Sequence, residues 1–140
     1  MKETKKIGRE CLGARMRMLN RMITAIYDDA LSNAGVKTSQ FSMLVAISNL
    51  EEARPAEVAK LLEMDESTLS RNVERMCAKG WLRLEPDHDR RSHRIKVTGK
   101  GMALISKGYA GWEKAQAEVA NQLGADGVAA LRLIVRKLRT

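Results

Sequence analysis

Apolar residues recur at helical spacing along most of the chain, and this pattern predicts a mainly α-helical protein. In the first segment they follow alternating steps of four and three residues, which is the spacing of one face of a helix. Later periodic stretches are separated by glycine, proline or short polar residues, which commonly end or start helices. The predicted helices cover residues 7–31, 39–49, 55–62, 66–79, 99–122 and 125–139.

Residues 82–97 follow a different pattern. Leu82 and Leu84 alternate with charged residues, and so do Ile95 and Val97. Alternation with period two is typical of a half-buried strand, so the two runs predict a hairpin with one wet face. The hairpin follows two short helices and a tight turn. The predicted fold class is therefore mainly α with a small β-hairpin wing, a winged helix-turn-helix with N- and C-terminal dimerisation helices.

The domain organisation follows from length and apolar surface. At 140 residues the chain is predicted to form one compact domain, with residues 37–98 as the winged helix-turn-helix region and residues 1–36 and 99–140 as the helical dimerisation region. The outer helices carry more apolar surface than a small winged-helix core can cover, so we expect them to bury it against a second copy. The residues expected at this homodimer contact are Leu12, Met16, Leu19, Leu131, Ile134, Val135 and Leu138.

Positive charge is concentrated in two stretches. The formal net charge is +8; residues 1–21 hold seven Lys and Arg against two Asp and Glu, and residues 82–101 hold six against three, so the two stretches account for the whole excess. Such a distribution indicates a polyanionic partner, although a merely basic soluble protein is the alternative. Aromatic residues form only 4% of the chain, which does not favour stacking on single-stranded bases.

The predicted helix 66–79 has two unlike faces. Leu69, Val73 and Met76 share one side with Cys77 and are expected in the core, while Arg71 and Arg75 lie one turn apart on the other side. From there they can reach guanine edges or phosphates in a major groove; an ordinary solvated face is the alternative.

The predicted hairpin tip, residues 87–92, is almost wholly charged. Its guanidinium groups suit the negative potential of an adjacent minor groove, and Asp89 is expected to hold Arg91 in one orientation. An ordinary solvated hairpin is the other interpretation of this tip. The residues expected to bind DNA are Ser67, Thr68, Ser70, Arg71, Arg75, Asp89, Arg90 and Arg91.

These segments resemble the MarR family of bacterial winged-helix regulators over roughly residues 8–139. The family's wing pattern is Asp-x-Arg, three residues, an aliphatic, one residue, an aliphatic, Thr, two residues, Gly. The resemblance implies a homodimer that presents one recognition helix and one wing per subunit to a palindromic double-stranded DNA operator. It also implies a repressor that a small aromatic or anionic ligand controls. The wing pattern is complete at Asp89, Arg91, Ile95, Val97, Thr98 and Gly101.

Two residues depart from that family's pattern: Arg54, and Trp81, which replaces a usual small aliphatic residue and indicates a packing change. Arg54 stands where the family commonly has a Thr or Ser helix cap, which predicts either a weaker helix start or an extra phosphate contact. Inside the predicted helix 99–122, Gly108 and Gly111 indicate a kink or a close helix contact, because glycine costs about 1 kcal/mol against alanine there.

Several classes of function find no support in the sequence. No catalytic constellation or phosphate-binding glycine loop is evident, so neither an enzyme nor a cofactor is expected. His88 and His93 have no partners at ligand spacing, so no metal is expected. No apolar run is long enough for a membrane span, and the expected location is the cytoplasm.

Two alternatives stay open: a winged-helix adaptor for another protein, and a redox-sensing regulator acting through Cys11. Cationic neighbours of Cys11 in the sequence favour a reactive thiolate. The methionines either fill the core or line an adaptable ligand pocket.

Overall fold

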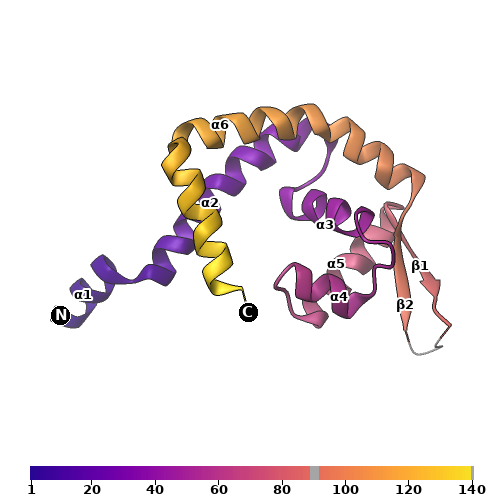
Figure 1. Ribbon diagram of the computed structural model, residues 1–140, viewed down its shortest axis with the longest axis horizontal. Helices are drawn as coiled ribbons and strands as arrows, with labels where there is room; N and C mark the ends of the chain where they lie inside the picture. The colour runs from indigo at the N-terminus through magenta and orange to yellow at the C-terminus, as the bar shows by residue number, and fades with distance from the viewer. Residues whose placement is uncertain (89–91, 140) are drawn as a thin grey trace. The chain divides into compact units, whose positions relative to one another are not determined.

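The computed structural model describes residues 1–88 and 92–139, and its chain divides into two compact units. One unit comprises residues 1–30 and 111–140, and the other comprises residues 31–110. The mainly helical chain with one antiparallel hairpin confirms the predicted fold class (Figure 1). The elements are α1 (Lys2–Glu10), α2 (Leu12–Leu31), the 3₁₀ turn η1 (Ser32–Ala34), α3 (Thr38–Ser48), α4 (Pro55–Leu61), α5 (Glu66–Ala78), β1 (Leu82–Pro86), β2 (His93–Val97) and α6 (Gly99–Leu138).

The first predicted helix is two helices, so the expectation of one continuous helix from residue 7 was wrong. Cys11 separates α1 from α2 with an extended backbone, φ −67° and ψ 109°. Gly8 and Gly13 flank this break, and glycine is a poor helix former. No residue of α1 is buried, so tertiary packing does not compensate for them there.

The helices predicted at 99–122 and 125–139 form α6, which is interrupted where the sequence places Gly124. This residue has φ 74° and ψ 168°, a conformation that glycine adopts without steric cost. At the other end, the hydroxyl of Thr98 accepts a hydrogen bond from the Gly101 amide at 3.0 Å, as a helix cap does. The same hydroxyl donates to the Gly80 carbonyl at 2.5 Å, so Thr98 joins the chain after α5 to the start of α6.

The core of residues 31–110 lies among α3, α4, α5 and the hairpin. Leu44, Val58, Leu69 and Ile95, one from each of these elements, are at most 1% exposed. In the hairpin Leu82 pairs with Val97 and Leu84 with Ile95. Ala53 adds an isolated antiparallel bridge to Ile95, so the segment before α4 runs beside β2.

Gly108 explains how α6 approaches α3. A Cβ atom at Gly108 would lie 2.7 Å from Cε2 of Phe41 and 3.2 Å from Cδ2 of Leu31. Of the two explanations predicted for this glycine, a kink or a close helix contact, the structure shows the close contact. Across the described residues, none of the helices combines the length and the apolar character needed to cross a bilayer.

Candidate nucleic-acid interface

Helix α5 has the two faces that its sequence predicts. Leu69, Val73 and Met76 are buried, and Cys77 is half-buried beside them. Burial raises the pKa of the Cys77 thiol, which keeps it protonated at neutral pH. Of the residues predicted to contact DNA from this helix, Ser67, Arg71 and Arg75 are exposed on the opposite side, Ser70 is exposed on the flank toward the hairpin, and Thr68 is half-buried.

The first turn of α5 is organised by Asp65. Its carboxylate accepts hydrogen bonds from the Thr68 amide at 2.7 Å, from the Ser67 hydroxyl at 2.7 Å and from the Thr68 hydroxyl at 3.0 Å. The hydrogen bond from Ser67, followed by those from Thr68, lowers the pKa of Asp65 to about 2. Because both hydroxyl protons point to Asp65, each oxygen presents lone pairs outward, where it can accept a hydrogen bond.

Arg71 and Arg75 are available to an external anion. In the described parts of the chain neither forms an ion pair, and Arg71 makes only a long hydrogen bond of 3.4 Å to the Thr68 hydroxyl. An exposed guanidinium presents a planar fork of donors that fits phosphate or the guanine edge bidentately. The geometry therefore leaves two cations, one helical turn apart, on the exposed face of α5.

Cations on the strands of the hairpin are engaged within the chain. Arg83 pairs with Glu85 at 2.9 Å, and Arg94 lies 3.5 Å from Glu52 and 3.9 Å from Glu85. Counting basic residues in the sequence therefore overestimates how many positive charges on the two strands are free to bind an external anion. Of the predicted wing residues, Asp89, Arg90 and Arg91 lie outside the described residues, so their roles stay predictions.

The structure identifies a wing residue that sequence reasoning missed. The side chain of Asp87 is 7% exposed and lies 2.8 Å from Nε of Arg54. It also accepts hydrogen bonds from the His88 amide at 2.9 Å and the Ser92 hydroxyl at 3.1 Å. These contacts, with Arg54 first, hold the pKa of Asp87 well below its usual range. The departure at Arg54 was the only sequence signal for this pair.

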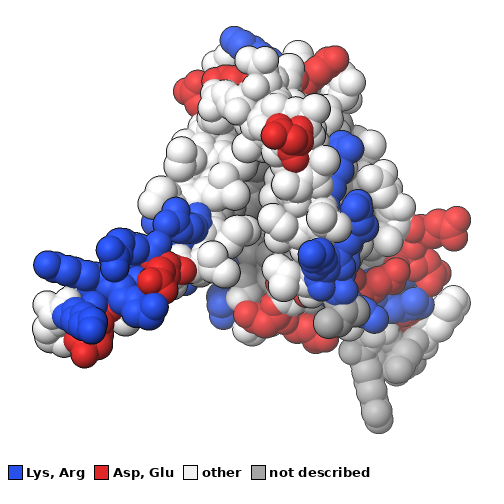
Figure 2. Space-filling view, turned by 60° about the vertical axis from the view of Figure 1, so that its left-hand side comes forward, with Lys and Arg blue, Asp and Glu red and all other residues white. Residues whose placement is uncertain are grey.

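A second positive patch lies on α1. Its lysines and arginine are exposed, and Figure 2 shows Lys and Arg side chains gathered over this N-terminal helix. Lys6 pairs with Glu10 at 2.7 Å along the same helix. Cys11 is half-buried at the end of α1; its sulfur accepts a hydrogen bond from the Ala14 amide at 3.4 Å, and its predicted redox role is not tested by this arrangement.

The residues predicted at the homodimer contact all lie in the unit formed by residues 1–30 and 111–140. Within a single chain Leu12 and Leu138 are each 75% exposed, Val135 is 53% exposed and Met16 is 45% exposed. Ile134 is 39% exposed, and Leu19 and Leu131 are half-buried. Their exposed apolar area is compatible with an interface between copies.

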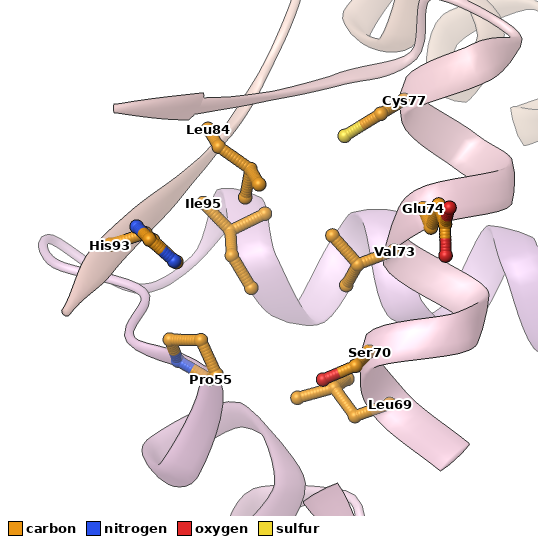
Figure 3. Close-up of a pocket in the computed structure, with 9 residues that line it drawn as sticks. All are labelled: Pro55, Leu69, Ser70, Val73, Glu74, Cys77, Leu84, His93 and Ile95. Atoms are coloured by element: carbon orange, nitrogen blue, oxygen red, sulfur yellow. The ribbon is translucent and has the colours of Figure 1, made fainter. Parts of the chain in front are cut away.

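A cavity of about 340 Å³ separates α5 from the hairpin. In Figure 3 the side chains of Val73, Ile95 and Leu84 point toward its centre from these two elements. Its volume is within the range of small-molecule sites. Among the described residues the lining carries no Lys or Arg, so this part of it suits a neutral apolar molecule better than an anion. The described residues of the lining are Pro55, Leu69, Ser70, Val73, Glu74, Cys77, Leu84, His93 and Ile95.

Comparison with known proteins decides the family. Residues 34–92 match the profile of the MarR family. The multiple antibiotic resistance protein MarR of Escherichia coli K12 is 30% identical over 143 aligned residues, covering 99% of each chain. The chain belongs to the MarR family. The resemblance inferred from the wing and recognition-helix motifs is thus confirmed, and this MarR-family protein is a winged helix-turn-helix transcription regulator.

Solved structures of other family members extend this comparison. A cysteine-to-serine mutant of E. coli MarR in complex with operator DNA matches with a TM-score of 0.85 and 26% identity, covering 96% of this chain and 98% of that one. The transcriptional regulator MOSR of M. tuberculosis, in complex with DNA, matches with a TM-score of 0.79 and 32% identity, covering 94% and 100%. Both proteins share the fold described above, and each was solved in complex with DNA.

Proposed function

We propose that this MarR-family protein acts as a homodimeric repressor that binds a palindromic operator in double-stranded DNA in the cytoplasm. The exposed face of α5 enters the major groove, with Ser67, Thr68, Ser70, Arg71 and Arg75 toward the bases and phosphates. The observation that carries the proposal is the pair Arg71 and Arg75, which have no ion-pair partner among the described residues and lie on a helix held from behind by its buried face.

The wing supplies the second contact in this proposal. Arg90 and Arg91, at the hairpin tip in the sequence, enter the adjacent minor groove, and Asp89 orients Arg91. Two subunits related by a two-fold axis place their recognition helices about one DNA turn apart, at roughly 34–36 Å. The DNA complexes of E. coli MarR and MOSR support duplex DNA, rather than another protein, as the partner.

A small ligand controls the affinity for DNA in this proposal, and the cavity between α5 and the hairpin is a suitable place for it. A molecule bound there contacts both DNA-binding elements. It changes the affinity only if it binds the free and DNA-bound conformations unequally. A neutral aromatic compound fits this site better than an anionic one, since the part of the lining that the structure describes includes Glu74 and no Lys or Arg.

The test begins with selection of the preferred sequence from random duplexes and titration of that operator at several salt concentrations. The logarithm of affinity should fall with the logarithm of salt at a slope of about −0.9 per neutralised phosphate. Arg71→Ala, Arg75→Ala and Arg91→Ala should weaken operator binding, while Lys107→Ala, on the exposed side of α6, serves as the control for removal of one charge. Neutral and anionic aromatic compounds are then added to the same titration.

The absence of any association with mixed-sequence duplexes at low ionic strength would overturn the DNA-binding role and favour a protein adaptor. If Arg75→Ala and Lys107→Ala change operator affinity equally, the proposal that α5 forms part of the DNA interface is wrong. If only anionic compounds release the operator, the proposed ligand class is wrong, whereas the DNA-binding role stands.

A further inference from the structure

The segment just before α4 runs along the hairpin as a strap, which we define as residues 51–54. Each of its four residues contacts the hairpin in succession, by backbone or by side chain. The strap thus connects the wing to the start of the helix-turn-helix. Its contacts lie side by side on the hairpin, on β2 and at the beginning of the tip. These contacts are Lys96 Nζ to the Glu51 carbonyl at 3.3 Å, Arg94 to the Glu52 carboxylate at 3.5 Å, the Ile95 amide to the Ala53 carbonyl at 2.7 Å, and Arg54 Nε to Asp87 at 2.8 Å.

The last residue of the strap, Arg54, uses two sides of its guanidinium. Nε donates to Oδ2 of Asp87 at 2.8 Å, and Nη2 lies 2.9 Å from Oε2 of Glu52. A guanidinium holds these donors in one fixed plane, whereas the ammonium of lysine is a point charge that cannot reproduce the fork. Arg54 is therefore fixed against two carboxylates that belong to different parts of the unit.

Asp87 connects this contact to both ends of the wing tip. The carboxylate that Arg54 holds also accepts the Ser92 hydroxyl at 3.1 Å, and the Asp87 amide donates to the Ser92 carbonyl at 3.2 Å. Residues 87 and 92 are the described ends of the loop that carries Arg90 and Arg91 in the sequence. A side chain that is 7% exposed with this many hydrogen bonds has little rotational freedom.

We propose that Arg54 is the positioning residue of the wing: through Asp87 it holds both ends of the tip loop in a fixed place relative to α4 and α5. Arg54 immediately precedes Pro55, the first residue of α4, and α4 packs against α5. A displaced wing then no longer reaches its groove even though its own arginines are intact, since geometry and not charge alone determines the affinity. This inference rests on the proposed function, because it concerns the same DNA-binding surface.

The competing role for Arg54 is a direct bond to a DNA phosphate. The two roles differ in what Asp87 does. Under the positioning role Asp87 is required, and removal of either partner has the same consequence. Under direct binding, removal of the Asp87 charge leaves Arg54 free to bind phosphate and does not weaken the affinity.

The experiment is a double-mutant cycle on the selected operator with Arg54→Gln, Asp87→Asn and the double variant, each titrated at several salt concentrations. We expect each single change to lower operator affinity by roughly tenfold, about the effect of one mismatched base pair, and the double variant to bind no more weakly than either. The salt slope should become shallower by about 0.9 for each phosphate that the wing no longer neutralises. Partial unfolding reduces the active fraction and leaves that slope unchanged, so the slope separates positioning from a general structural effect.

Two further variants are measured in the same way: one that keeps the charge of Arg54, and one that serves as a control. Arg54→Lys keeps the charge and removes the fork, so it should bind as weakly as Arg54→Gln. Arg83→Gln is the matched control, because it removes an arginine from the same hairpin whose ion pair, to Glu85 at 2.9 Å, joins two residues of β1 and makes no direct contact with Arg54 or Asp87. Thermal melts of all variants check that each is folded at the titration temperature.

Three results overturn the inference while wild-type protein still binds its operator. The first is wild-type affinity in both Arg54→Gln and Asp87→Asn. The second is weak binding by Arg54→Gln together with unchanged binding by Asp87→Asn and Arg54→Lys, which assigns Arg54 to a phosphate. The third is additive effects of the two changes in the double variant. Failure of the wild-type protein itself to bind any duplex instead rejects the proposed function.

Discussion

At the scale of the residue, Asp65 links the stability of α5 to the surface that α5 presents. One carboxylate caps the helix through the Thr68 amide and orients the hydroxyls of Ser67 and Thr68. An aspartate before the first turn also interacts favourably with the positive end of the helix dipole. The same side chain therefore determines where the recognition helix begins and which groups its first turn offers to a groove.

Replacing Asp65 by alanine should lower the melting temperature by a few degrees and weaken operator binding, because the cap and the partner of both hydroxyls are removed. Asp65→Asn keeps an acceptor for the Thr68 amide and should have a smaller effect. The pKa of Asp65 falls from 3.8 to about 2 in the folded chain, so its contribution to stability is complete above about pH 3.8 and disappears as the pH falls through about 2. Melting curves of the wild type and Asp65→Ala between pH 5 and pH 2 should therefore converge; a constant difference would contradict this account.

At the scale of the element, the packing of α6 on α3 depends on the missing side chain of Gly108. The helix can approach Phe41 and Leu31 only because no Cβ atom occupies the contact, as the distances of 2.7 and 3.2 Å show. The intrinsic preference for alanine in helices favours the opposite choice by about 1 kcal/mol. Tertiary contact thus outweighs local propensity at this position.

Gly108→Ala should destabilise the fold by about 1–3 kcal/mol through overpacking, in spite of the better helix propensity of alanine. Urea denaturation monitored by circular dichroism measures the free energy of unfolding. Gly99→Ala is the matched control in the same helix, since nothing lies within 4 Å of a Cβ atom there. A gain in stability from Gly108→Ala similar to that of the control would show that the two helices are not in close contact.

At the scale of the whole molecule, apolar surface remains uncovered in the unit formed by residues 1–30 and 111–140. Leu12 and Leu138 are each 75% exposed, and Val135 is 53% exposed. Each such side chain gains about 1.5–3 kcal/mol when it is fully buried. Several of them together favour association of two chains through this unit.

A charge placed in that surface should dissociate the dimer. Val135→Asp is expected to sediment as a monomer at micromolar concentration and to bind the operator more weakly, because one subunit engages only one half-site. Ala103→Asp places the same charge on an exposed position in residues 31–110 and should leave the sedimentation of the dimer unchanged. Sedimentation of the wild-type protein as a monomer would reject the homodimer.

The features that the sequence predicted correctly are those whose causes are local. Leu69, Val73 and Met76 recur at the helical period, and the structure buries all three. The caps formed by Asp65 and Thr98 are equally local, because the side chain of each accepts a hydrogen bond from an amide three residues along. The prediction failed at Cys11: the apolar stripe begins at Leu12, so it carried no information about the break that separates α1 from α2.

The sequence by itself determined most of the helices, the hairpin, the two faces of α5 and, through its motifs, membership of the MarR family, but not the break at Cys11. Only the tertiary structure decided that Arg54 contacts Asp87, 33 residues away. It also decided that Arg83 and Arg94 are neutralised by carboxylates and that a cavity lies beside α5. The physical reason is range: periodicity and capping act within one or two turns, whereas the partner of a charged side chain is chosen by the path of the folded chain around it.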